Sequence, residues 1–270
     1  MDTRQPRFPG RGPRHPPGRV PGPGDNHLTP GAPGDGPSPG AEPASATRTS
    51  KEDSAMTTIG ILGAGRVGSS LARKLASAGH DVTVGCRTPD ERAAAHAAGP
   101  RPVIAFADQR TAAATADIVV HATPGDTALE RLRAFRAELA GKILVDVSNA
   151  THEAPDRMPG DLVHPGSSLA ERLQEALPTT HVVKTLNTML FTVMTAPDTL
   201  STPPTAYLSG NDEAAKEAVA GLLADLGWHR TWIEDLGDIT TARATEALVL
   251  LVPHILRRHG FTPFAVSLAR

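Results

Sequence analysis

The chain has 270 residues, with 27 Lys and Arg against 29 Asp and Glu, and 39% of its residues are hydrophobic. This near-neutral balance gives no reason to expect a nucleic-acid or membrane partner, and no apolar run approaches the roughly 20 residues that span a bilayer. The single cysteine, Cys86, excludes an intrachain disulfide and suits a reducing compartment. We therefore expect a cytoplasmic protein of one large domain or two small ones.

The first 55 residues are rich in proline and glycine, with clusters such as Pro21–Gly24 and Pro37–Gly40. They show neither helical nor strand periodicity. Such a segment buries too little apolar surface to offset the entropy of ordering, so residues 1–55 are predicted to be a disordered tail. Met56 directly precedes the first expected strand, so a natural start at Met56 is an equally good interpretation.

From Met56 onward, short β-rich runs alternate with segments whose apolar residues recur at helical spacing, as at Val67, Leu71 and Leu75. In chain order the pattern predicts a strand over 58–62, a helix over 67–77, a strand over 81–85, a helix over 92–98, a strand over 117–122, a helix over 126–139 and a strand over 142–147. This alternation is typical of parallel strands joined by crossover helices on both faces of a sheet.

The second half continues the pattern. A capping box at Ser168–Glu171 predicts a helix to about residue 177. Strands are expected over 181–186, 205–209 and 228–233, and a helix over 212–226 follows the turn Gly210-Asn211-Asp212. A long apolar helix over 240–258 contains Pro253, which predicts a bend or break near Leu250. This helix is too apolar to face solvent, so it belongs to the core or to a subunit interface.

The fold class is therefore α/β, a Rossmann-type doubly wound parallel sheet with a small C-terminal α/β extension. Residues 56–150 are expected to form a dinucleotide-binding domain. Residues 151–270 would supply the rest of the sheet and a helical part that completes the substrate crevice.

A Gly-x-Gly-x-x-Gly motif lies between the first expected strand and the first expected helix, the context in which it indicates a dinucleotide-binding turn. Its first glycine permits a tight turn, the second lets the backbone approach a pyrophosphate, and the third allows close helix packing. The free N–H groups of the helix N-terminus favour phosphate. The candidate cofactor-binding residues are Gly63, Ala64, Gly65, Arg66, Val67 and Gly68.

The end of the second strand indicates which dinucleotide binds. An NAD site usually carries an acidic residue there for the ribose 2′-hydroxyl. This chain instead has Cys86-Arg87-Thr88, and an arginine suits a 2′-phosphate because it can donate two charge-assisted hydrogen bonds. The motif therefore favours NADP(H), with Arg66 and Arg92 as further candidates for phosphate contact. The alternative is that Arg87 is a solvated surface residue.

Polar residues follow three later strands at the edge where ligands bind in open α/β sheets. We expect Thr123, Pro124, Ser148 and Asn149 to border the cofactor, and Asn187, Thr188 and Met189 to border a substrate. No nucleophile–base pair and no zinc-ligand spacing emerge, so no catalytic residue and no metal ligand is predicted. His121, inside a strand, is interpreted as a packed residue. Hydride transfer between two bound redox groups needs mainly orientation and a dry crevice.

These motifs together resemble the NADPH-dependent reductases of the 8-hydroxy-5-deazaflavin coenzyme F-420. The resemblance spans about residues 57–258. It rests on Ile61–Gly68, Val84–Arg87, Ala122–Pro124, Asp146–Asn149, Val183–Thr188, Leu208–Asp212 and Asp235–Asp238. The first of these motifs is common to many Rossmann proteins, whereas the segment around Asn187 and the turn Gly210-Asn211-Asp212 are more particular.

The resemblance implies a Rossmann domain with a small C-terminal part, and commonly a homodimer. It implies that Arg87 and Thr88 hold the 2′-phosphate, that Thr123 and Pro124 lie near the nicotinamide, and that Asn187 lies near the second substrate. The family often has Ser at the position of Cys86, which would weaken one phosphate contact here.

The expected activity is hydride transfer between NADP(H) and coenzyme F-420. Two other functions stay open. One is NADPH-dependent reduction of another small acceptor, such as an imine, a flavin or ferric iron. The other is a non-enzymatic NADP(H)-binding regulator.

Overall fold

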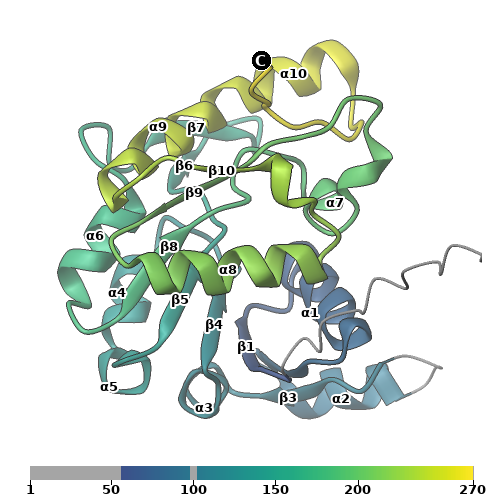
Figure 1. Ribbon diagram of the computed structural model, residues 1–270, viewed down its shortest axis with the longest axis vertical. Helices are drawn as coiled ribbons and strands as arrows, with labels where there is room; N and C mark the ends of the chain where they lie inside the picture. Colours follow the sequence, from purple (N-terminus) through teal and green to yellow (C-terminus); the bar gives the residue numbers. More distant parts are fainter. Residues whose placement is uncertain (1–55, 98–101, 270) are drawn as a thin grey trace, which may run out of the picture. The chain divides into compact units, whose positions relative to one another are not determined.

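The computed structural model describes residues 56–97 and 102–269, and the tail predicted for residues 1–55 lies outside them. Among these residues an eight-stranded sheet carries two layers of helices (Figure 1). Its strands are β1 Thr58–Leu62, β2 Asp81–Gly85, β3 Ala105–Ala107, β4 Ile118–His121, β5 Ile143–Asp146, β8 His181–Lys184, β9 Ala206–Gly210 and β10 Ile233–Asp235.

The strand order is β10-β9-β8-β5-β4-β1-β2-β3. The order reverses between β1 and β4, and ligands bind at such a switch point outside the carboxyl ends of the strands. Six strands are mutually parallel, as the alternation predicts, whereas β9 pairs antiparallel with β8, and β10 runs parallel to β9. The later strands therefore join the same sheet, which is mostly parallel.

Both faces of the sheet are buried, and the side chains alternate between them. Ile59, Ile61 and Val120 pack into one apolar cluster, whereas Leu62 and Val119 pack into the other. The first cluster is covered by α1 Arg66–Ala78, α7 Phe191–Met194 and α8 Glu213–Asp225. The second is covered by α3 Gln109–Thr115, α4 Ala128–Arg133, α5 Arg136–Leu139, α6 Leu169–Ala176 and α9 Ala242–Ala247. The core is built mostly of aliphatic side chains, with Trp228 as a buried aromatic residue in the first cluster.

Several elements differ from the sequence-based expectation. The helix α2 begins at Pro89, three residues before its predicted start, and runs to Ala97. The strand β3, the helix α3 and the hairpin of β6 Thr151–Glu153 and β7 Pro159–Leu162 are too short to give a periodic signal. The predicted helix over 126–139 is two short helices, α4 and α5, and the last strand is β10 rather than 228–233, because a 3-10 turn occupies Arg230–Trp232.

The C-terminal helix is interrupted, as Pro253 predicts. It consists of α9, a 3-10 turn at Leu248–Leu251 and α10 Val252–His259. The segment Ile239–His259 is long and apolar enough to cross a membrane by length and composition alone, which is weak evidence. Its α9 part packs against α6. The side chains of Leu250 and Leu251 are 42% and 45% exposed.

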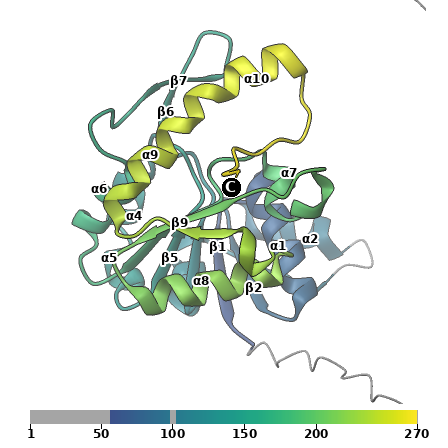
Figure 2. The same cartoon turned by 45° about the horizontal axis from the view of Figure 1, so that its top comes forward.

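The end of the chain returns from α10 toward α7 (Figure 2). Residues 264–268, here called the C-terminal strap, lie along the loop that follows β8. Leu190 N–H donates to the Phe264 carbonyl at 2.9 Å, and Val266 N–H donates to the Thr188 carbonyl at 3.0 Å. Leu268 N–H donates to Thr205 Oγ1 at 3.0 Å. The strap therefore holds the loop in place by backbone hydrogen bonds.

Candidate functional site

The glycine turn has the geometry of a dinucleotide-binding turn. Gly63 has φ +120°, and a Cβ built on it would lie 2.6 Å from the Ala122 carbonyl oxygen. A Cβ on Gly68 would lie 1.9 Å from the Gly63 carbonyl oxygen. The start of α1 therefore packs against the turn so closely that any side chain at position 68 would clash. A Cβ on Gly65 meets nothing within 4 Å. The backbone at Gly65 therefore faces open space.

The first turn of α1 offers donors to that space. Gly65 is the N-cap, and no side chain of the described residues caps the helix there. The N–H groups at the start of a 13-residue helix, with the helix dipole behind them, favour a phosphate. The turn thus fits a dinucleotide pyrophosphate on the observed geometry.

The end of β2 presents the residues that sequence analysis assigns to the 2′-phosphate. Cys86 is buried and its N–H donates to the Ala107 carbonyl at 2.9 Å, while Arg87 and Thr88 are exposed. Beside them lies a cavity of about 130 Å³ between α1 and α2. It is lined by residues that include Ala64 of the glycine turn, Arg73, Arg92 and His96. Arg92, one of the two further candidates for phosphate contact, thus lines the same cavity as Ala64 of the glycine turn, whereas Arg87 and Thr88 are not among the lining residues.

Three strands end in charged or titratable residues that lie side by side. In the parallel register His121 of β4 is the partner of Asp146 of β5, and Asp146 is the partner of Lys184 of β8. All three side chains are at most 1% exposed. Because each residue is the last of its strand, the row lies at the carboxyl edge of the sheet.

The carboxylate of Asp146 is the centre of this row. Its Oδ1 lies 2.9 Å from His121 Nδ1 and accepts from Ser148 Oγ at 2.8 Å, and its Oδ2 accepts from Lys184 Nζ at 2.8 Å. Burial alone would raise the pKa of Asp146, but the charge of Lys184 and the hydrogen bond from His121 hold that pKa well below its ordinary value. Asp146 is therefore ionised, and it is fully supplied with donors.

Lys184 joins the row to the C-terminal helices. Its ammonium also lies 2.9 Å from Glu246 Oε1 on α9. Burial alone would lower the pKa of Lys184, but the charges of Asp146 and Glu246 raise it. Glu246 in turn accepts from the N–H groups of Leu169 and Ala170, at 2.9 and 3.2 Å, and so caps the N-terminus of α6.

Thr123 continues the row toward the glycine turn. Its Oγ1 lies 2.7 Å from His121 Nε2 and accepts a hydrogen bond from Arg131 on α4. A Cβ built on Gly63 would lie 3.1 Å from Thr123 Cγ2, so Thr123 borders the switch point directly. Pro124 beside it is exposed.

The loop after β8 brings the predicted substrate residues to the same edge. Asn149 Nδ2 donates to the Asn187 carbonyl at 2.8 Å, and Asn187 Nδ2 donates to Asn149 Oδ1 at 2.9 Å. Leu186 has φ +59°, a conformation that costs energy in a non-glycine residue. Within the described residues the buried hydroxyls of Thr185 and Thr188 have no hydrogen-bond partner. Unpaired buried polar groups next to a strained residue are typical of ligand sites.

The predicted strand-end residues therefore meet along one edge, where Asn149 and Asn187 are hydrogen-bonded to each other and Ser148 is hydrogen-bonded to Asp146. Sequence analysis missed the hydroxyl–imidazole–carboxylate row of Thr123, His121 and Asp146, because its members are up to 25 residues apart. The signal that could have found it is the placement of His121 and Asp146 as the last residues of strands expected to be neighbours.

The chain is similar in sequence and in fold to several known proteins. The family model for coenzyme F420-dependent NADP oxidoreductases matches residues 58–150. The crystal structure of a candidate F420-dependent NADP reductase from Arthrobacter sp. FB24 superposes with a TM-score of 0.71 at 38% identity, over 79% of this chain and 100% of that one. The F420-dependent NADP reductase of Methanocaldococcus jannaschii is 29% identical over 209 residues, which are 72% of this chain and 90% of the relative.

The metalloreductase STEAP3 of Rattus norvegicus is 29% identical over 192 residues, which are 71% of this chain. The matched segment spans only 36% of that protein's length. The match to the whole of the Arthrobacter chain, at 38% identity, decides the assignment. This chain belongs to the family of coenzyme F420-dependent NADP oxidoreductases, and it is an NADP-dependent oxidoreductase.

Proposed function

We propose that the protein transfers hydride between NADP(H) and an 8-hydroxy-5-deazaflavin, coenzyme F-420, in the crevice at the carboxyl edge of β1, β4, β5 and β8. The observation that carries the proposal is that Thr123 contacts the glycine turn on one side and continues, through the row of strand ends, to the Asn149–Asn187 pair on the other. A cofactor on the turn and an acceptor on the loop would then be neighbours.

The cofactor half rests on Gly63–Gly68 for the pyrophosphate and on Arg87 and Thr88 for the 2′-phosphate. The nicotinamide would lie against Thr123 and Pro124, with Ser148 and Asn149 beyond it. NADP(H) supplies a hydride at the nicotinamide when bound, and these residues bind and orient the dinucleotide.

The acceptor half rests on Asn187, Thr188 and Met189. The side chains of all three are at most 8% exposed. The C-terminal strap covers this segment, since Met189 and Ala265 form an isolated β-bridge. Such cover excludes water from the Thr188 hydroxyl, which has no hydrogen-bond partner within the described residues. F-420 as this acceptor is supported by the names of the relatives.

The direct test mixes the purified full-length chain with NADPH and oxidised F-420 and follows the deazaflavin absorbance. We expect the absorbance to fall, and NADH to be a much poorer donor. If the chain binds NADPH tightly but leaves F-420 oxidised, the acceptor is another small molecule. Because STEAP3 is a metalloreductase by name, flavin and ferric chelates are the next acceptors to assay in the same cuvette.

The cofactor preference is tested separately with Arg87→Asp. A carboxylate at the end of β2 repels the 2′-phosphate and accepts from a ribose hydroxyl, so we expect NADPH to bind at least about 10-fold more weakly. NADH should bind no worse. Dissociation constants from fluorescence titration measure both effects.

Arg258→Asp on α10 is the matched control, since it makes the same change of charge at another exposed arginine. It should leave both dissociation constants unchanged. Equal NADPH affinity in Arg87→Asp and Arg258→Asp would exclude Arg87 as the 2′-phosphate ligand.

A further inference from the structure

The hydroxyl of Thr123, the imidazole of His121 and the carboxylate of Asp146 form a continuous hydrogen-bonded chain, with Oγ1–Nε2 at 2.7 Å and Nδ1–Oδ1 at 2.9 Å. An ionised Asp146 can only accept, so Nδ1 of His121 carries the hydrogen of that bond. The other ring nitrogen, Nε2, is hydrogen-bonded to the Thr123 hydroxyl, so whether Nε2 carries a hydrogen depends on that hydroxyl. This is the arrangement by which a carboxylate fixes the tautomer of an imidazole that exchanges protons with a hydroxyl.

Two protonation states of His121 are compatible with this geometry. When Nε2 is bare, the Thr123 hydroxyl hydrogen is used in the bond to it. When Nε2 carries a hydrogen, both lone pairs of Thr123 Oγ1 are occupied, by His121 and by Arg131, and the hydroxyl hydrogen is free to point away from them. The second state therefore presents a proton donor at Thr123.

The charges around the imidazole bear on both states. Asp146 on β5 contacts it directly, and Lys184 on β8 and Glu246 on α9 lie behind Asp146. Arg131 on α4 lies beyond Thr123. These two carboxylates, one ammonium and one guanidinium sum to zero net charge.

Position and exposure fit a path to the crevice. His121 is fully buried, so it has no direct access to solvent or to a ligand. Thr123 is half-buried and adjoins the glycine turn. A proton on His121 can therefore reach a bound molecule by way of Thr123.

We propose that His121 and Thr123 relay to the acceptor the proton that accompanies hydride transfer. The proposal rests on the proposed function, in which NADPH loses a hydride and is oxidised, and the acceptor gains a hydride and a proton and is reduced. The hydride goes to an acceptor carbon, and Thr123 gives its hydroxyl proton to an acceptor nitrogen or oxygen. Thr123 then takes the proton of Nε2, and once the product has left, a proton from solvent returns to His121 by way of the half-buried Thr123. The reverse reaction returns the proton along the same path.

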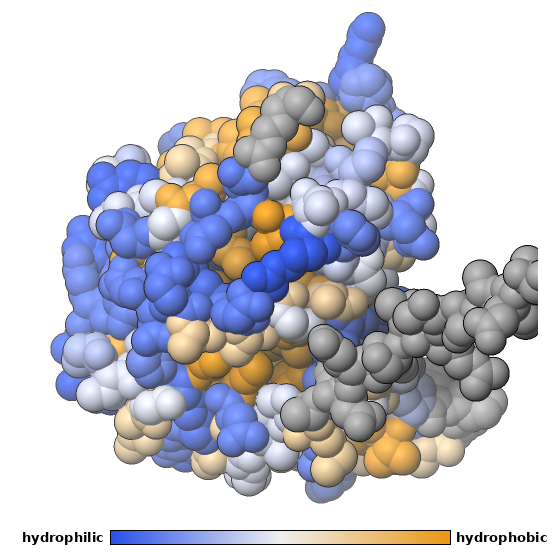
Figure 3. Space-filling model, viewed as in Figure 1, coloured by the Kyte–Doolittle hydropathy of each residue, from blue (hydrophilic) through white to orange (hydrophobic). Residues whose placement is uncertain are grey.

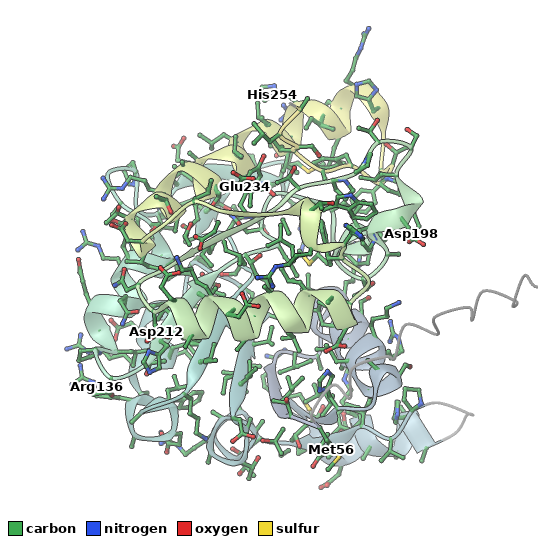
Figure 4. All side chains as sticks on the ribbon, viewed as in Figure 1. Met56, Arg136, Asp198, Asp212, Glu234 and His254 are labelled. Carbon is green, nitrogen blue, oxygen red and sulfur yellow. The ribbon has the colours of Figure 1, made fainter. Side chains whose placement is uncertain are left out.

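The variants separate this relay from a merely structural row. His121→Gln keeps a polar side chain but cannot pass a proton, and Thr123→Val keeps the shape of the residue but lacks the hydroxyl. Thr123→Ser restores the hydroxyl. His254→Gln on α10, labelled in Figure 4, removes an exposed histidine far along the chain and serves as the control.

With NADPH and F-420, we expect His121→Gln and Thr123→Val to lower kcat by about 10²-fold, the usual contribution of a general acid. The dissociation constant of NADPH should stay the same in His121→Gln, whose imidazole is buried away from the cofactor. The slowdown in D2O should increase in both variants, because proton delivery becomes limiting. Thr123→Ser should recover most of the rate. Unchanged kcat and an unchanged D2O effect in His121→Gln would overturn the relay.

A second measurement does not depend on the acceptor. In the ¹⁵N NMR spectrum of the imidazole, Nδ1 of His121 should carry hydrogen throughout, and Nε2 should shift on Thr123→Val but not on His254→Gln. If the ¹⁵N chemical shift of Nε2 is the same in Thr123→Val as in wild type, the relay is wrong even if F-420 is reduced. If wild type fails to reduce F-420 while Nε2 responds, the proposed acceptor is wrong and the relay stands.

Discussion

Lys184 holds together three parts of the chain that are far apart in sequence. Its ammonium bridges Asp146 on β5 and Glu246 on α9, and all three side chains are at most 3% exposed. Two buried carboxylates would repel each other without it. A buried charge that loses its partner is more costly than the pair is stabilising, so this residue is essential to the fold near the site.

We therefore expect Lys184→Met to lower the free energy of unfolding by about 3–5 kcal/mol, because two carboxylates are left buried without a counter-charge. Chemical denaturation at neutral pH measures the loss. Lys216→Met is the matched control. Its partners Glu213 and Asp235 have side chains that are 84% and 43% exposed. Water can solvate these carboxylates when the lysine is absent, so the free energy of unfolding should fall by only about 0–1 kcal/mol. Equal losses would refute the distinction.

At the scale of elements, each of the three glycines of the turn meets a different structural requirement. Gly63 needs its positive φ, Gly68 needs to have no side chain against a neighbouring backbone, and Gly65 needs only to leave space for what binds. The requirements at Gly63 and Gly68 come from the fold, whereas the requirement at Gly65 comes from the ligand.

Two substitutions separate these duties. Gly68→Ala places a methyl group against the Gly63 carbonyl, which is backbone and cannot move aside, so we expect a fall in stability of several kcal/mol, about the size of a severe overpacking change. Gly65→Ala meets no protein atom and should leave Tm unchanged while weakening NADPH binding. Thermal unfolding and fluorescence titration check the two outcomes, and normal NADPH binding by Gly65→Ala would place the pyrophosphate elsewhere.

The sequence predicts most of these elements, because the buried strands are rich in β-branched residues and the longer helices repeat their apolar residues at helical spacing. It predicts β1, β2, α1 and α8 almost to the residue. It fails for β3 and for the β6–β7 hairpin, whose three or four residues carry no period. The antiparallel direction of β9 could not be predicted either, because the sequence pattern of a strand is the same whichever way the strand runs in the sheet.

The site follows the same rule. Residues in local motifs, such as Arg87 after β2 and Asn187 after β8, are visible as strand ends. The bond between His121 and Asp146 depends on register across two strands, and the ion pair of Lys184 with Glu246 depends on how α9 folds back. These are tertiary contacts, and no local pattern encodes them.

At the scale of the whole molecule, the interrupted C-terminal helix leaves apolar surface uncovered. Leu250, Leu251 and Phe261 are 42%, 45% and 62% exposed. Apolar surface is visible at the top of Figure 3, over the region of α10. Large apolar side chains exposed at both ends of one helix, here α10, are typical of interfaces.

We therefore propose that the protein is a homodimer through this face, and expect Leu250→Glu combined with Leu251→Glu to give a monomer that still binds NADPH. Sedimentation velocity measures the mass, and NADPH titration confirms that the fold is intact. Arg258→Glu on α10 makes the same change of net charge, two units more negative, at an exposed residue and serves as the control. A wild-type monomer at all concentrations would disprove the proposal.

The C-terminal strap gives the molecule a property of another kind. Its backbone hydrogen bonds to Thr188 and Leu190 make the last residues of the chain part of the support of the crevice loop. Any event that displaces the strap therefore changes the affinity of the crevice for whatever contacts that loop. By thermodynamic linkage, a ligand bound to the loop changes the equilibrium constant for displacement of the strap by the same factor. The chain end and the crevice are in this sense one coupled equilibrium.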